Sequence, residues 1–191
     1  MDKIHLRTAR LLLEAPARAD IDAITAACQD PELQRRVPVP VPYTREEAEG
    51  YVTACSDIGW ATGKSCTWAI RIGGELAGAI SLDNIGSEQG TIGYWMAPQF
   101  RERGLLTEAA QAVVEFGFAP APDGLGLQRI EWHAYAGNVA SARVARRVGF
   151  RFEGTLRLGA MGRHAREDDW VAGILAGDSR SPTEWLILSQ K

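Results

Sequence analysis

Hydrophobic and polar residues alternate with a period of two in several short stretches of the chain, and this pattern predicts β-strands. The clearest pair covers 66–72 and 75–82, joined by Gly73-Gly74, a two-residue sequence typical of a tight hairpin turn. Further strands are expected over 6–13, 91–96, 129–135, from Phe150 onward and over 169–175. These segments are enough for one large sheet.

Apolar residues recur every three or four positions in four other segments, which predicts amphipathic helices. One helix is expected to begin at Asp20, and a second follows the capping box Thr44-Arg45-Glu46-Glu47. Two more are expected over 105–118 and 138–148. The alternating Val-Pro segment 37–42 must stay extended, because each proline fixes its own φ and restrains the residue before it.

The order of these elements predicts a mixed α/β fold. The helix between strands 91–96 and 129–135 is a crossover connection, which makes those two strands parallel. The other strands follow one another as antiparallel partners. A doubly wound nucleotide-binding fold would alternate strand and helix from its start, and this chain does not. We therefore expect a single domain over 1–191, with helices flanking a mostly antiparallel sheet.

Composition narrows the class of protein. The chain has 191 residues, of which 46% are hydrophobic and 24% charged, as in an ordinary globular domain. Its apolar runs are too short for a membrane span, and its N-terminus has no signal-peptide core. A net charge of −3 argues against nucleic acid as the main partner. Three cysteines without paired spacing predict reduced thiols, a cytoplasmic location and no metal site.

The segment 96–109, Met-Ala-Pro-Gln-Phe-Arg-Glu-Arg-Gly-Leu-Leu-Thr-Glu-Ala, has the pattern of an anion site. A strand ends, a proline turns the chain, and Arg101 and Arg103 precede Gly104, after which a helix begins. Free amides at a helix N-terminus carry partial positive charge, and glycine lets a ligand approach the backbone. A pyrophosphate fits such a site. An ordinary loop-to-helix transition with solvated arginines also fits the segment on its own.

A second pattern lies in 138–150, where Asn138 and Ser141 open a helix and Gly149-Phe150 closes it. Capping alone explains Asn138 and Gly149. Three arginines follow one side of this helix, at 143, 146 and 147. They are either a solvated face or contacts for phosphate groups, and for the second role we favour Arg146 or Arg147.

Together, the two segments resemble the GNAT acetyltransferase superfamily. Arg101-Glu-Arg-Gly104-Leu-Leu106 is similar to its acetyl-CoA pyrophosphate loop, and Thr107-Glu108-Ala109 is typical of the ribosomal-protein (Rim-type) branch. Asn138, Ser141, Gly149 and Phe150 resemble the later helix of that branch, and the likeness extends over about residues 6–178. Two positions depart from the pattern. Leu106 replaces a small residue, and Ala160 stands where the Rim-type enzymes carry a glutamate proposed as the base.

The resemblance implies that strands 91–96 and 129–135 splay apart at the centre of the sheet, with the pantetheine arm of acetyl-CoA in the gap. A backbone amide near Trp95 or Met96 would polarise the thioester carbonyl. Ser141 would protonate the leaving thiolate, and Asn138 would hold the pantetheine arm. The cofactor-binding set implied is Trp95, Met96, Ala97, Arg101, Glu102, Arg103, Gly104, Leu105, Leu106, Thr107, Asn138, Ser141 and Arg147.

The acceptor amine must lose its proton before it attacks the thioester. An α-amine, with a pKa of about 7.7–8.0, loses it far more easily than a lysine near 10.4. Glu131 and His133, two positions apart on one strand face, are the first candidates for the base. Asp83, Glu88 and His164 are the alternatives. Asp83, Trp132 and Tyr135 are expected in the acceptor pocket; the competing interpretation is that His133 and Trp132 are ordinary sheet residues.

The function that the resemblance implies is transfer of an acetyl group from acetyl-CoA to a protein N-terminal α-amine or a small-molecule amine. Direct attack in a ternary complex is expected, without metal, nucleic acid or membrane, and a homodimer is common among relatives. Another acyl donor such as succinyl-CoA, or a non-catalytic acyl-CoA sensor, remains an alternative. A dinucleotide-dependent oxidoreductase lacks its glycine fingerprint here.

Overall fold

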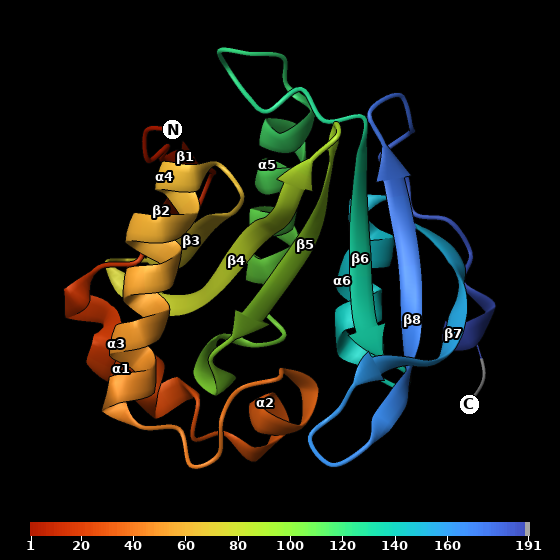
Figure 1. The fold of residues 1–191 in the computed structure, drawn as a ribbon. Helices are drawn as coiled ribbons and strands as arrows, with labels where there is room; N and C mark the ends of the chain where they lie inside the picture. Colours follow the sequence, from red (N-terminus) through yellow and green to blue (C-terminus); the bar gives the residue numbers. More distant parts are fainter. Residues whose placement is uncertain (190–191) are drawn as a thin grey trace.

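One eight-stranded sheet organises the molecule in this computed structural model, which describes residues 1–189 (Figure 1). The strand order is β1-β2-β3-β4-β5-β6-β8-β7, and every neighbouring pair is antiparallel except β5 and β6, which are parallel. This confirms the predicted fold class. The strands are β1 Leu6–Arg7, β2 Leu12–Glu14, β3 Cys66–Ile72, β4 Glu75–Gly86, β5 Gln89–Met96, β6 Arg129–Tyr135, β7 Arg151–Met161 and β8 Arg166–Leu175.

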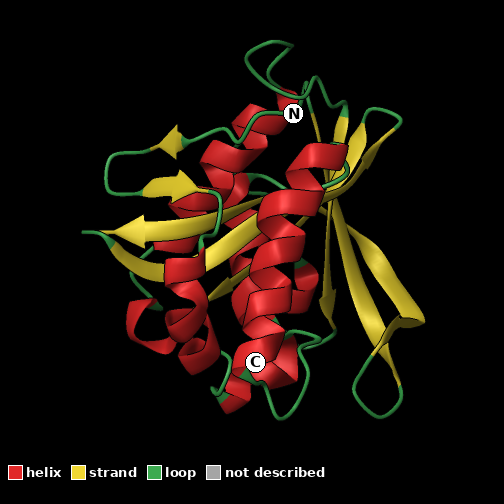
Figure 2. Ribbon diagram, turned by 60° about the vertical axis from the view of Figure 1, so that its left-hand side comes forward, coloured by secondary structure: helices red, strands yellow, loops and turns green. Residues whose placement is uncertain are grey.

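Helices cover both faces of the sheet (Figures 1 and 2). In the view of Figure 1, α5 and α6 lie behind it, and α1, α3 and α4 lie in front of β2–β4. A π-helical segment at 54–59 links α3 to α4, so that helical structure continues from Arg45 to Thr62. The helices are α1 Ile21–Ala27, α2 Pro31–Arg36, α3 Arg45–Thr53, α4 Trp60–Thr62, α5 Leu105–Phe118 and α6 Val139–Val148, with short 3-10 turns at 18–20, 98–100 and 186–188.

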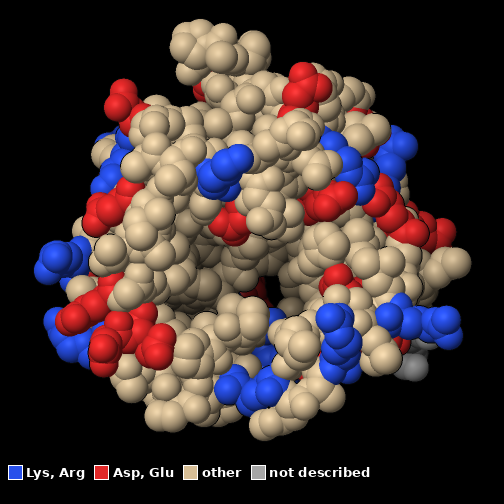
Figure 3. All heavy atoms as spheres, viewed as in Figure 1, with Lys and Arg blue, Asp and Glu red and all other residues tan. Residues whose placement is uncertain are grey.

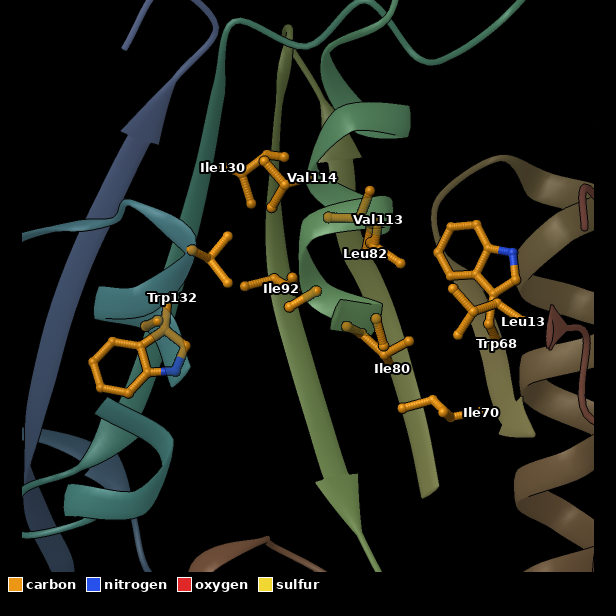
Figure 4. Packing of buried hydrophobic residues seen from close by; sticks show 14 of the residues in the cluster. Leu13, Trp68, Ile70, Ile80, Leu82, Ile92, Val113, Val114, Ile130 and Trp132 are labelled. Atoms are coloured by element: carbon orange, nitrogen blue, oxygen red, sulfur yellow. The ribbon is translucent and has the colours of Figure 1, made fainter. Parts of the chain in front are cut away.

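The main core lies between the sheet and α5 and α6. Val113 and Val114 of α5 face Ile92 and Ile130, which come from the two parallel strands (Figure 4). A smaller core lies on the opposite face, where α1 and α3 pack together and Trp95 of β5 packs against them. Side chains of β5 are therefore packed into a core on each face of the sheet.

The structure differs from the prediction at two places. The strand expected over 6–13 is broken by a turn, in which the Thr8 amide donates to the Leu11 carbonyl and the Leu11 amide donates to Thr8 Oγ1. The helix α2 was not predicted. Asp30 caps it by accepting from the Leu33 amide at 3.0 Å, and Pro31 occupies its first position. Asp-Pro is a helix-start signal, but six residues are too few to show a helical period.

The two parallel strands separate halfway along their length. They are paired only from Gln89 and Arg129 to Ile92 and Trp132. Beyond that point β5 stays paired with β4 as far as Met96, while β6 stays paired with β8. A wedge therefore opens between them, with α2 at its wide end (Figure 1). This is the splay that the sequence resemblance implied.

Candidate active site

A cavity of about 560 Å³ occupies the gap between β5 and β6. In Figure 3 the gap appears as a hollow near the middle of the molecular face. Its wall combines the end of β5, the start of α5, one side of α6, part of β6 and the segment around α2. From the expected cofactor set it includes Trp95, Met96, Arg101, Glu102, Gly104, Leu105, Leu106, Thr107, Asn138, Ser141 and Arg147.

The predicted anion site lies at one end of this cavity. Glu102 and Gly104 have left-handed backbones, with φ of 61° and 74°, and they turn the chain sharply into α5. Within residues 1–189, no carbonyl or side chain accepts from the amides of Leu105, Leu106 and Thr107. Unpaired amides at a helix N-terminus favour a bound anion. The loop geometry that the sequence indicated is therefore present.

The anion-site loop is braced by the turn between β1 and β2. Glu108 of α5 accepts from Thr8 Oγ1 at 2.5 Å and from Arg10 Nε at 2.7 Å. Arg10 Nη1 also donates to the Arg103 carbonyl at 3.2 Å. Burial raises the pKa of Glu108, but the bonds from Thr8 and Arg10 lower it, and the net pKa lies below the usual value. This brace was not predicted, although Thr8 and Arg10 lie within the range 6–178 over which the likeness extends.

The two loop arginines are held by protein groups. Arg101 Nε donates to the Met96 carbonyl at 3.1 Å, and its Nη2 pairs with Asp30 at the start of α2. The Arg103 guanidinium lies 5.7 Å from the centre of the Phe100 ring and does not line the cavity. Other arginines on the cavity wall are Arg36, Arg143 and Arg147. Arg101 and Arg103 are thus engaged by protein groups, and Arg143 and Arg147 are the α6 arginines on the cavity wall.

The register of β5 decides which amide faces the gap. The Ala97 amide donates to the Ala77 carbonyl at 2.8 Å, so Ala97 is turned toward the strand β4. Hydrogen-bonding directions alternate along an antiparallel strand, which turns Trp95 toward β4 as well and leaves Met96 facing β6. The Met96 carbonyl indeed meets Arg101 on that side. Of the amides predicted to polarise a thioester, Met96 is the one in position.

Ser141 lies on the cavity wall with its hydroxyl oriented by two neighbours. Trp132 Nε1 donates to Ser141 Oγ at 3.0 Å, and Ser141 Oγ donates to Tyr94 Oη at 3.2 Å. Tyr94 Oη in turn donates to the Ser141 carbonyl at 3.0 Å. Burial raises the pKa of Tyr94 well above its usual value, which keeps the phenol neutral. Trp132 is core, as its competing interpretation held, and also points its N–H at Ser141.

The opposite face of the sheet carries a histidine between two carboxylates. His133 Nδ1 lies 2.7 Å from Asp169 Oδ2, and His133 Nε2 lies 3.6 Å from Glu131 Oε2. His133 lines the cavity, whereas Asp169 is buried with 6% exposure. Arg129 Nε donates to Glu131 Oε1 at 2.9 Å, and Arg129 Nη2 donates to Glu153 Oε2 of β7 at 2.6 Å. Sequence analysis placed Glu131 and His133 together but missed Asp169.

Several predicted site residues lie away from the cavity wall. Asp83 accepts from the hydroxyls of Ser65 and Ser81, and the Tyr135 hydroxyl donates to the Met161 carbonyl at 2.9 Å. Neither residue lines the cavity, and the same holds for Ala97, Glu88, Glu131, Ala160 and His164. Glu131 lies next to a lining residue, with its Oε2 3.6 Å from His133 Nε2. The acceptor pocket predicted around Asp83 and Tyr135 is therefore not assembled as expected.

Two general features of the described chain complete the site. Across residues 1–189, no three side chains among His, Cys, Asp and Glu are grouped closely enough to hold a metal ion. Over the same residues, no helix combines the length and apolarity that a membrane span needs.

Comparison with known proteins places this geometry in a family. The sequence pattern of the acetyltransferase (GNAT) domain matches residues 10–151. The chain belongs to the GNAT acetyltransferase family. Its relatives include YoaA of Bacillus subtilis, an N-acetyltransferase that is uncharacterized, at 29% identity over 80% of this chain and 85% of YoaA. YdaF of Bacillus subtilis, which carries the name of a ribosomal N-acetyltransferase, is 36% identical over 45% of this chain and 46% of YdaF.

Solved structures share the same GNAT fold. RimL, a ribosomal L7/L12 α-N-protein acetyltransferase in complex with coenzyme A, superposes with a TM-score of 0.80 at 22% identity, over 90% of this chain and 98% of RimL. RimJ of Mycobacterium smegmatis, bound to a CoA disulfide, gives 0.79 at 22% identity, over 91% and 87% of the two chains. The predicted family is thus confirmed, and this chain is a GNAT acyltransferase with Rim-type proteins among its structural neighbours.

Proposed function

We propose that this GNAT domain transfers an acetyl group from acetyl-CoA to a primary amine, by direct attack within a ternary complex. The observation that carries the proposal is the cavity through the β5–β6 gap, with free helix amides at one end and Ser141 on its wall. Neighbours of this fold bound to coenzyme A or acetyl-CoA support the same ligand here.

The chain's own groups suit each part of that ligand. The amides of Leu105, Leu106 and Thr107 would bind the pyrophosphate, with Arg147 near its charges. Asn138 uses its side-chain oxygen to cap α6 at the Ser141 amide, which leaves its NH₂ group to hold the pantetheine arm. Leu106 lies on the cavity wall and narrows it at the position where a smaller residue is usual.

Two groups would act on the thioester itself. The Met96 amide faces the gap, where it can donate to the carbonyl oxygen as negative charge develops. Ser141 Oγ accepts from Trp132 and donates to Tyr94 Oη at 3.2 Å, and its hydrogen would turn from Tyr94 to the leaving sulfur. The amine attacks the carbonyl carbon directly, and no nucleophile of the protein needs to intervene.

A binding assay followed by a turnover assay tests the proposal. Acetyl-CoA, succinyl-CoA, CoA and NADH are compared by thermal shift, and about 2.7 kcal/mol of stabilisation is expected from a CoA species at 100 times its Kd. Release of free CoA from acetyl-CoA is then followed with and without a seryl peptide or a lysyl peptide. Amine-dependent release supports the enzyme. Binding without release would instead favour an acyl-CoA sensor, and a larger shift with succinyl-CoA would favour that donor. A cytoplasmic location, a single domain over 1–191 and a homodimer remain predictions.

A further inference from the structure

The histidine that lines the acceptor side of the cavity has a defined orientation. His133 Nδ1 contacts Asp169 Oδ2 at 2.7 Å; Asp169 is buried, and the His133 side chain is 36% exposed, so the contact is shielded from water on the Asp169 side. A carboxylate only accepts hydrogen bonds, which places the proton of a neutral ring on Nδ1. The Nε2 atom then carries a lone pair. Its distance of 3.6 Å to Glu131 is too long for a hydrogen bond, so Nε2 is free to take a proton.

Glu131 is fixed beside that lone pair by its own ion pair. Arg129 holds Glu131 Oε1 at 2.9 Å, and the same guanidinium binds both oxygens of Glu153 on β7, at 2.8 and 2.6 Å. The second oxygen of Glu131, Oε2, remains next to His133 Nε2. From the other side of the cavity, α2 contributes Glu32 and Arg36, which pair with each other.

The contacts of His133, Glu131 and Asp169 form a site that suits a cation. His133 Nε2 and Glu131 Oε2 lie 3.6 Å apart, and the carboxylate of Asp169 contacts the other ring nitrogen. A protonated amine fits this site, because it can donate to both His133 Nε2 and Glu131 Oε2 at once. A neutral acceptor would gain only a hydrogen bond from Glu131, and an anionic one would be repelled by it. Ser141 lies on the other face of the sheet, so it does not compete for the same proton.

We propose that Asp169 is a positioning residue that fixes His133 as the general base, and that Glu131 receives the acceptor as a primary ammonium ion. This inference rests on the proposed function and names the acceptor class and the base. The ammonium gives one proton to His133 Nε2 and stays bound to Glu131 as the neutral amine. Its nitrogen forms a bond to the thioester carbon, and the carbon–sulfur bond breaks with its electron pair on sulfur. Ser141 protonates that sulfur and regains a proton from the new amide nitrogen through water.

The test compares Asp169→Asn, His133→Gln and Glu131→Gln with the matched control Asp168→Asn. Asp168 is adjacent and exposed, and its carboxylate accepts only from the Leu158 amide among the described residues. Acetyl transfer to a seryl peptide with a free N-terminus and to a lysyl peptide with a blocked N-terminus is measured from pH 5.5 to 9.5. Thermal shift with CoA verifies that each variant is folded and keeps its CoA site.

Each variant has its own expected signature. Asp169→Asn should lower kcat about 10- to 100-fold with little change in KM, because the ring loses its fixed tautomer. Asp169→Glu should recover part of kcat. Glu131→Gln should instead raise KM for both peptides. A wild-type kcat in Asp169→Asn or in His133→Gln would overturn the inference.

A second readout separates this inference from the proposed function. If the wild-type protein acetylates neither peptide, the proposed function fails, and ¹⁵N NMR of His133 in the CoA complex decides the inference alone. A proton on Nδ1 that is lost in Asp169→Asn and kept in Asp168→Asn supports the positioning role. A proton on Nε2 in the wild-type protein would refute it.

Discussion

Removal of the Ser141 hydroxyl should damage stability and catalysis by separate mechanisms. In Ser141→Ala, the N–H of Trp132 loses its acceptor at 3.0 Å while the indole stays buried, with 1% exposure. A buried donor without a partner costs about 1–3 kcal/mol, which for a chain of this size lowers Tm by about 2–12 °C. Loss of a general acid lowers kcat by about 10²- to 10⁴-fold.

The two effects are measured independently. Thermal unfolding gives the stability change, and Ser181→Ala, at an exposed serine outside the cavity, is the matched control. For catalysis, acetyl-CoA is compared with an acetyl thioester whose thiol is more acidic. A better leaving group needs less protonation, so the rate loss in Ser141→Ala should shrink with the second donor. A normal kcat alongside a reduced Tm would mean that Ser141 only satisfies Trp132, and the proposed acid would be wrong.

Three further predictions concern the anion-site loop and its brace. Gly104→Ala should destabilise the protein by about 1–2 kcal/mol in urea unfolding, because φ is +74° at this position. The cost comes from the backbone conformation and not from a clash, since the nearest atom to a new Cβ, Arg10 Nη2, is 3.7 Å away. Arg10→Ala should weaken CoA binding about 2- to 10-fold by calorimetry, since the loop loses its bond at Arg103, while the control Arg7→Ala should bind normally. Glu108→Gln should be less stable than wild type at pH 7. This difference in stability should narrow as the pH falls from about 4.5 toward the lowered pKa of Glu108, because the carboxyl stabilises the fold only while it is ionised; a difference that stays constant below pH 4.5 would contradict this.

Much of the fold follows from local sequence patterns. The helix predicted over 105–118 and the strand predicted over 129–135 have these bounds in the structure, because both have a strong apolar period and clear end signals. The turn at Gly73-Gly74 also lies where it was expected, with both glycines at positive φ. The turn inside 6–13 was missed because its stabilising partner, Glu108, lies about 100 positions later in the chain.

The site was predictable where one segment contains all the parts. The anion-site loop and the start of α6 are of this kind, since the backbone and a local cap define them. Pairings between distant segments were not predictable. Arg101 pairs with Asp30, which lies 71 positions earlier in the chain. Asp169 contacts His133 only because β8 lies beside β6. An arginine in a motif therefore shows where positive charge is available, and only the tertiary structure shows which group pairs with it.

One feature of the sheet explains how the proposed acid and base work without interfering. Pairing between the parallel strands ends at Ile92 and Trp132, and beyond this point the two strands do not pair with each other. Side chains alternate between the two faces, so Trp132 points to Ser141 on α6 while His133 points to Asp169 on the other side. A thioester in the gap would have its sulfur near one face and its carbonyl carbon open to the other. The leaving thiolate then takes its proton from Ser141, and the incoming amine gives its proton to His133. The same separation of β5 and β6 opens the thioester to both groups.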